Sequence, residues 1–164
     1  MTNQEMLPIR RFLQTMDVVR REGEHLDYSR GRVFGQPVDA QWVRKLEAAP
    51  ELAERLEAFV SRFGRMQDTM ASKLFPRLLQ AQAEQTDTLL ETLNRLEKLG
   101  LLESVDQWLE ARNLRNRLVH EYVEDMAKFK QDLKLARDYC AMLSRTNQRI
   151  ADYAANKMNI APST

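Results

Sequence analysis

The sequence PELAERLEAFVSRFGRMQDTMASKL, residues 50–74, carries the clearest structural signal in the chain. Its apolar residues recur every three or four positions, which is the period of one face of an α-helix. Pro50 suits the first turn of this helix. Pro76 should kink or end it, because proline lacks a backbone N–H and clashes with the preceding turn. The apolar face comprises Leu52, Leu56, Phe59, Phe63, Met66, Met70 and Leu74.

The same helical period recurs on both sides of this stretch, between clear start and stop signals. Gly31, Gly35 and Pro37 mark a loop near the N-terminus. We expect the other helices from about Leu7 to Ser29, from Asp39 through Trp42, from Thr86 or Asp87 to a terminating Gly100, from Ser104, which forms a capping box with Gln107, and from about Val123 to Tyr153. The sequence therefore predicts an all-α fold, an up-and-down bundle of four main helices plus a short helix.

Length and composition limit the possible classes of protein. The 164 residues fit one domain, residues 1–164, with a frayed tail over residues 156–164. A formal charge of +1 gives no overall electrostatic attraction to nucleic acid or to an anionic membrane. Cys140 is alone, which excludes an intrachain disulfide and a cysteine-based zinc cluster. With no run of about 18 apolar residues and no signal peptide, we expect a soluble, cytoplasmic protein without a membrane partner.

Polar residues that could perform chemistry gather in LEARNLRNRLVHEY, residues 109–122. On a helix Arg115 and Tyr122 share nearly one face, and Asn116 and His120 share a neighbouring face. Histidine exchanges protons near neutral pH, and an arginine beside it can bind a phosphate and stabilise developing charge. The pair suits RNA cleavage by the internal 2′-hydroxyl without a metal. By spacing alone, however, a histidine at a helix end is more often a packing or capping residue, and the arginines a solvated face.

The segment RNRLVHEY, Arg115 to Tyr122, resembles the Arg-x4-His-x-Tyr motif of the HEPN superfamily, in its HepT-like branch. The resemblance implies an enzyme, a metal-independent endoribonuclease in which Arg115 and His120 are the catalytic pair. Asn116, Arg112 and Arg117 would support catalysis or bind RNA. Two such motifs would face each other across a homodimer groove, and no metal or other cofactor would be needed.

The same resemblance implies the toxin half of a bacterial toxin–antitoxin pair, with a cognate nucleotidyltransferase as antitoxin. Tyr122 resembles the tyrosine that this partner modifies with adenylyl groups, which would add bulk and negative charge beside the phosphate site. Residues 1–49 form an N-terminal helical extension that is longer than a minimal HepT-like chain would have.

Two other functions remain open at this point. In related small helical proteins, a similar segment belongs to a non-catalytic, substrate-binding subunit of a minimal nucleotidyltransferase. Such a protein would bind its partner tightly and cleave no RNA. The chain could also be a helical dimerisation protein in which the motif is vestigial, so that Arg115, His120 and Tyr122 could all be changed silently.

Overall fold

The computed structural model describes residues 2–121 and 125–160, and the side chains of His120 and Glu121 lie outside this description. Within these ranges the chain is helical, and the all-α fold is confirmed. The elements in chain order are α1 (Asn3–Phe34), α2 (Ala40–Ala48), α3 (Pro50–Thr69), the π-helical turn η1 (Met70–Leu74), α4 (Phe75–Ala81), α5 (Leu89–Lys98), α6 (Val105–Glu121) and α7 (Met126–Asn156).

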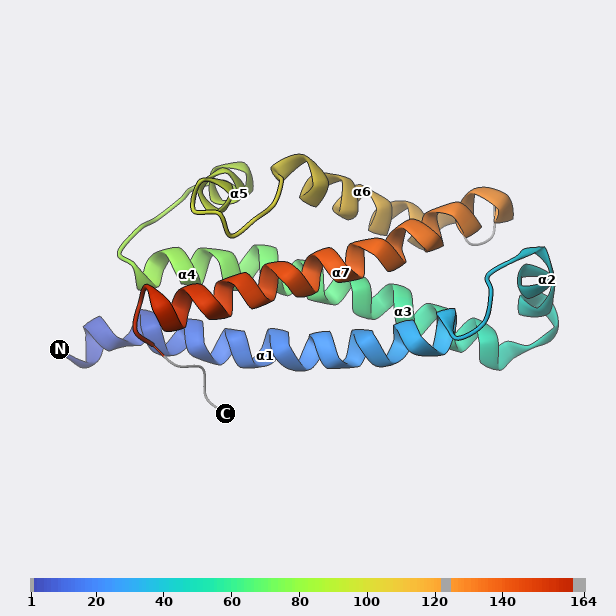
Figure 1. Ribbon diagram of the computed structural model, residues 1–164, viewed down its shortest axis with the longest axis horizontal. Helices are drawn as coiled ribbons and strands as arrows, with labels where there is room; N and C mark the ends of the chain where they lie inside the picture. The colour runs from blue at the N-terminus through green and yellow to red at the C-terminus, as the bar shows by residue number, and fades with distance from the viewer. Residues whose placement is uncertain (1, 122–124, 161–164) are drawn as a thin grey trace.

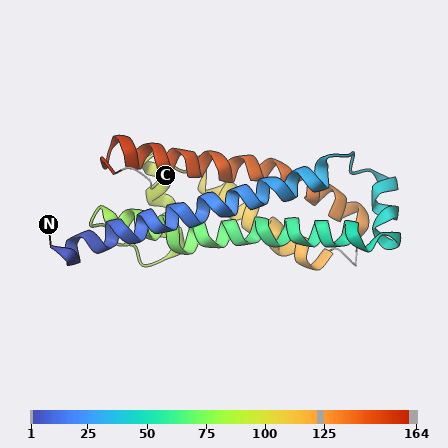
Figure 2. The ribbon, with the colours of Figure 1, turned by 90° about the horizontal axis from the view of Figure 1, so that it is seen from below.

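Three long rods run along the length of the molecule (Figures 1 and 2). They are α1, the segment from α3 through η1 into α4, and α7. The helices α5 and α6 lie over these rods on one side, and α6 contacts both α3 and α7. The short helix α2 stands across one end, where the chain passes from α1 to α3. Such a bundle leaves the outer face of α6 free of other described helices.

The helix that begins at Pro50 continues past Pro76, where we expected a kink or an end. It passes through the π-helical turn, in which the N–H of Phe75 bonds to the carbonyl of Met70, five residues back. The wider turn places Pro76 at the start of α4, where a missing N–H costs little. The proline is therefore accommodated by a local change in helical pitch, and the rod runs on to Ala81.

Helix α1 is longer at both ends than the expected segment from Leu7 to Ser29. It begins after Thr2, which forms a capping box with Glu5. At the other end it continues through Gly31, because the residues beyond that glycine are held by packing. Phe34 meets Phe59 edge-on, with ring centroids 5.4 Å apart, and the guanidinium of Arg137 lies over the Phe34 ring, 5.5 Å from its centroid.

Most of the expected helix ends are found in the structure. Asp39 caps α2 by accepting the N–H of Trp42 at 2.9 Å, and Ser104 accepts the N–H of Gln107 at 3.2 Å. Gly100 has φ +76°, the left-handed conformation expected of a helix terminator. The cap of α5 is Thr88 and neither of the expected residues, Thr86 and Asp87, since the Thr88 hydroxyl accepts the N–H of Glu91.

The last described residues differ from the expected frayed tail. Met158 and Ile160 are partly buried against the core, and their N–H groups bond back to the carbonyls of Tyr153 and Ala154. Burial of two apolar side chains holds residues 157–160 against the end of α7. The expectation for residues 161–164 falls outside the described residues.

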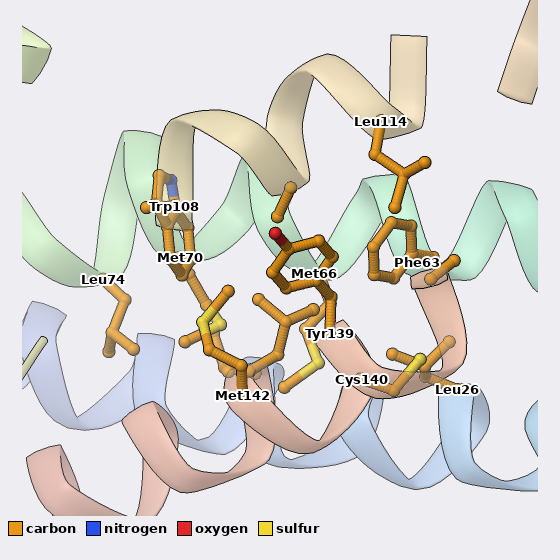
Figure 3. Packing of buried hydrophobic residues seen from close by; sticks show 14 of the residues in the cluster. Leu26, Phe63, Met66, Met70, Leu74, Trp108, Leu114, Tyr139, Cys140 and Met142 are labelled. Atoms are coloured by element: carbon orange, nitrogen blue, oxygen red, sulfur yellow. The ribbon is translucent and has the colours of Figure 1, made fainter. Parts of the chain in front are cut away.

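One continuous apolar core joins the rods to α6 (Figure 3). Residues of α1, among them Phe12, Val19 and Leu26, belong to this core together with Phe63 of α3 and Leu143 of α7. The expected N-terminal extension is thus packed into the same core as the rest of the chain. No helix in the described ranges has the length and apolarity that crossing a bilayer requires.

Candidate functional site

The site is built on α6, whose buried side fixes which residues face outward. Trp108, Ala111, Leu114 and Leu118 are buried at a spacing of three and four residues. Figure 3 shows Trp108 and Leu114 projecting from α6 toward the rods beneath it. The Trp108 ring also packs against Phe75, with centroids 4.9 Å apart. The polar residues of the motif therefore lie on the outer face of α6 and on the two sides next to its buried face.

Arg115 lies across α3 at the one position where that helix has a glycine. A Cβ atom on residue 64 would stand 2.6 Å from Nε of Arg115, so only Gly64 leaves room for this side chain. Beyond the glycine, Nη2 of Arg115 pairs with Oδ2 of Asp68 at 3.1 Å. Both side chains are partly exposed, so solvent and a ligand can reach the guanidinium. Helix α3 thus holds the arginine in place while leaving it accessible.

The other polar residues of the motif separate into two groups. Arg112 and Asn116 are exposed one turn apart on the outer face of α6. Arg117 turns instead toward α7, where Nε and Nη2 donate to the Asp132 carboxylate at 3.1 and 3.3 Å. The Asp132 side chain is only 11% exposed. Arg117 therefore links α6 to α7, while Arg112, Asn116 and Arg115 face away from that link.

His120 lies in the last turn of α6, four residues after Asn116. Its side chain is outside the described part of the structure. Tyr122, the expected modification site, also lies outside the described residues. The structure thus positions the arginine half of the expected catalytic pair in atomic detail.

Two hollows flank Arg115. The first, called here the apolar groove, has a volume of about 380 Å³ between α3 and α6. The second, called here the polar cavity, has a volume of about 510 Å³ and lies beside the π-helical turn. Arg115 lines the apolar groove, and its partner Asp68 lines the polar cavity. The groove is lined by Leu56, Glu57, Val60, Ser61, Arg115, Leu118, Val119 and Phe129.

Two titratable groups of α7 are buried away from these hollows. Burial, together with a hydrogen bond to Glu110, raises the pKa of Tyr139 to about 12. Burial also raises the pKa of the Cys140 thiol to about 12. Both groups are neutral at physiological pH, and a buried thiol is a poor nucleophile. Cys140 is packed as a small apolar residue, in agreement with its place on the apolar face of the last helix.

The raised pKa of Cys140 predicts a loss of stability at alkaline pH. Between pH 9 and pH 12 the thiol ionises in the unfolded chain while it stays protonated in the folded chain. Folding stability contributed by this group is complete below pH 9 and is lost as the pH rises toward 12, by about 1.4 kcal/mol per pH unit. Urea unfolding of wild type and Cys140→Ala over this range should show a shallower decline for the variant. Parallel declines would contradict the burial of a neutral thiol.

Sequence reasoning did not identify Gly64 or Asp68, which determine where Arg115 lies. A signal for Gly64 exists, because a glycine inside a strongly helical pattern indicates a close approach by another group. Asp68 has no such signal, because a single acidic residue on a helix usually faces solvent. Its role depends on the placement of α6 over α3.

No cluster of three or more histidine, cysteine, aspartate or glutamate side chains suited to a metal ion occurs among the described residues. None of the residues that line the apolar groove or the polar cavity belongs to residues 1–49. No family model, curated protein or solved structure matches this chain.

Proposed function

We propose that this protein is a metal-independent endoribonuclease of the HEPN type and the toxin of a bacterial toxin–antitoxin pair. The observation that carries the proposal is the position of Arg115. A partly exposed guanidinium is held over Gly64 by Asp68, at the boundary of two hollows. An arginine that only stabilised the fold would not need a glycine beneath it in order to reach an accessible surface. His120 follows on the same helix.

The proposed reaction uses the RNA itself as the nucleophile. His120 acts as a general base or acid while the 2′-oxygen attacks the adjacent phosphorus and the bond from phosphorus to the 5′-oxygen breaks. The 2′-hydroxyl loses its proton, the leaving 5′-oxygen gains one, and the products end in a 2′,3′-cyclic phosphate and a 5′-hydroxyl. Arg115 stabilises the additional negative charge on the phosphorane. Exposed Arg112 and Asn116 lie on the face of α6 along which the RNA backbone would run.

A homodimer with facing motifs is part of the proposal. The exposed Val119, with 58% of its surface accessible, stands beside the apolar groove and the Arg115 side chain. A second copy that covered this apolar surface would bring its own α6 near Arg115. The cognate nucleotidyltransferase would then act as antitoxin by modifying Tyr122.

A second candidate function is a non-catalytic binding subunit of a minimal nucleotidyltransferase. The ion pair between Arg115 and Asp68 favours this candidate, because the carboxylate neutralises part of the positive charge of Arg115 that would otherwise stabilise a phosphorane. For the ribonuclease proposal, the incoming phosphate must compete with Asp68 for the guanidinium. An exposed ion pair of this kind contributes only about 0–1 kcal/mol, so a phosphate can displace Asp68 from the guanidinium at little cost.

The test compares wild type with His120→Ala in the full-length protein. Each is expressed under tight control to measure growth arrest, and each purified protein is incubated with total RNA and a chelator. We expect arrest and chelator-resistant cleavage with wild type alone, and both chains should show the same helical circular dichroism. Arg10→Ala, at an exposed site on α1, is the matched surface control and should behave as wild type. If neither wild type nor His120→Ala arrests growth or cleaves RNA, the proposal is overturned in favour of the binding subunit.

A further inference from the structure

The polar cavity beside the proposed catalytic centre contains a buried amide with no partner. Gln67 of α3 lines the cavity and is only 3% exposed. Neither its Oε1 nor its Nε2 has a hydrogen-bond partner in the described structure. An unsatisfied buried polar atom costs about 1–3 kcal/mol, and the large majority of buried polar side-chain atoms in native proteins have a partner. The planar amide of Gln67 therefore provides one unpaired acceptor and one unpaired donor group in the wall of the cavity.

The rest of the lining is suited to an uncharged, partly polar ligand. Trp108 forms part of the wall but is only 1% exposed and packs against Phe75, while the partly buried Ala71 and Leu89 provide aliphatic contacts. The threonines of the wall are already paired, since Thr92 bonds to the hydroxyl of Thr86 and to the carbonyl of Thr88. Gln67 is thus the lining amide that remains to be satisfied by a ligand.

Charges around the cavity indicate how such a ligand would be oriented. Asp68 and Asp87 both line the cavity and are exposed, so a phosphate would be repelled from its interior. Arg112 also lines it, is exposed, and forms no ion pair with another described residue. A nucleotide would therefore place its base inside and its phosphate outside, near Arg112 and Arg115.

We infer that the polar cavity is a nucleobase-binding pocket, which takes one base of the RNA next to the bond that is cut. The inference rests on the proposed function for its RNA substrate, but the pocket itself can be tested without cleavage. A glutamine amide can bond in two places to a base edge that carries one donor and one acceptor, as adenine does. The Arg115–Asp68 pair joins the pocket to the catalytic arginine. A volume of about 510 Å³ is within the range of small-molecule pockets.

Gln67→Leu is a suitable variant because it removes both unsatisfied atoms and retains the volume. Replacing an unpartnered buried amide with an apolar side chain of similar shape should leave the fold as stable as before, or more stable. Gln80→Leu is the matched control, since Gln80 is exposed on the same rod and does not line the cavity. Thermal unfolding of both variants checks that the fold is retained.

The experiment measures binding of AMP, GMP, CMP, UMP and ribose 5-phosphate to the full-length protein by titration calorimetry. We expect at least one nucleotide to bind, ribose 5-phosphate to bind at least tenfold more weakly, and Gln67→Leu to lose about tenfold or more in affinity for that nucleotide. Gln80→Leu should bind as wild type. The inference is overturned if ribose 5-phosphate binds as tightly as the nucleotides, or if Gln67→Leu binds the nucleotide as tightly as wild type. It is also overturned if no nucleotide binds.

A second measurement separates this inference from the proposed function. Cleavage of total RNA is mapped by sequencing the 5′ ends produced by wild type and by Gln67→Leu. A change in base preference beside the cut supports the pocket as part of the ribonuclease. An identical pattern of cuts from both proteins rejects the pocket and leaves the ribonuclease standing. Nucleotide binding that depends on Gln67, in a protein that cuts no RNA, rejects the ribonuclease and shows that the pocket takes free nucleotides.

Discussion

On the ribonuclease function proposed above, Gly64→Ala is expected to lower RNA cleavage by roughly a hundredfold or more, although the substitution adds a single methyl group. The new Cβ would stand 2.6 Å from Nε, 3.1 Å from Cγ and 3.2 Å from Cζ of Arg115. The 2.6 Å distance is too short for a real contact and the other two are tighter than most, so the Arg115 side chain must shift from its place over α3. Loss of one group that stabilises transition-state charge typically costs a factor of about 10² to 10³.

Unfolding cannot account for such a loss. Alanine is favoured over glycine in the interior of a helix by about 1 kcal/mol, which offsets part of the steric cost. Gly31→Ala is the matched control, because Gly31 also lies inside a helix and its Cβ would have no neighbour within 4 Å. The control should gain up to about 1 kcal/mol in stability and cleave RNA at the wild-type rate.

A readout that does not depend on RNA cleavage accompanies this prediction. The side-chain Nε–H resonance of Arg115 should shift in Gly64→Ala and stay in place in Gly31→Ala, because only the former displaces the guanidinium. If Gly64→Ala cleaves RNA at the wild-type rate while the Arg115 resonance shifts, the fixed position of Arg115 is irrelevant to catalysis. An unchanged resonance would contradict the packing itself.

Much of the fold follows from local patterns in the sequence. The apolar period over residues 50–74, the caps at Asp39 and Ser104, and the terminator Gly100 are all signals within a few residues, and the structure contains each of them. The expectations that differ concern Pro76 and Gly31. A π-helical turn accommodates Pro76 without ending the rod, and packing of Phe34 against Phe59, which is distant in the sequence, accompanies a helix that continues through Gly31.

The candidate site could be predicted only in part, for a related physical reason. Helical spacing predicted one face for Arg115 and Tyr122 and a neighbouring face for Asn116 and His120; of these side chains, Asn116 is exposed and Arg115 is partly exposed. The partners of the arginines come from other helices, Asp68 for Arg115 and Asp132 for Arg117, and no local pattern indicates them. Gln67 lies between apolar residues of α3, and its unpartnered amide becomes evident only when the cavity around it is formed.

Trp108→Ala is expected to destabilise the protein by about 3–5 kcal/mol, which is a large part of the stability of a domain of this size. Trp108 is 1% exposed and packs against Phe75 with ring centroids 4.9 Å apart, so truncation removes a large apolar surface and leaves a void beneath α6. Urea unfolding followed by circular dichroism at 222 nm measures the change, and the midpoint should fall with an unchanged slope.

Tyr28→Ala is the matched control for this truncation. Tyr28 is also an aromatic residue on a helix, but 65% of its surface is exposed, so its removal should change the stability by less than about 0.5 kcal/mol. Because α6 carries both Trp108 and the Arg115 motif, the loss of this anchor should also loosen the helix that presents the arginine. A Trp108→Ala protein as stable as Tyr28→Ala would mean that α6 is held by its α7 contacts, through Arg117 and Asp132, and not by its buried tryptophan.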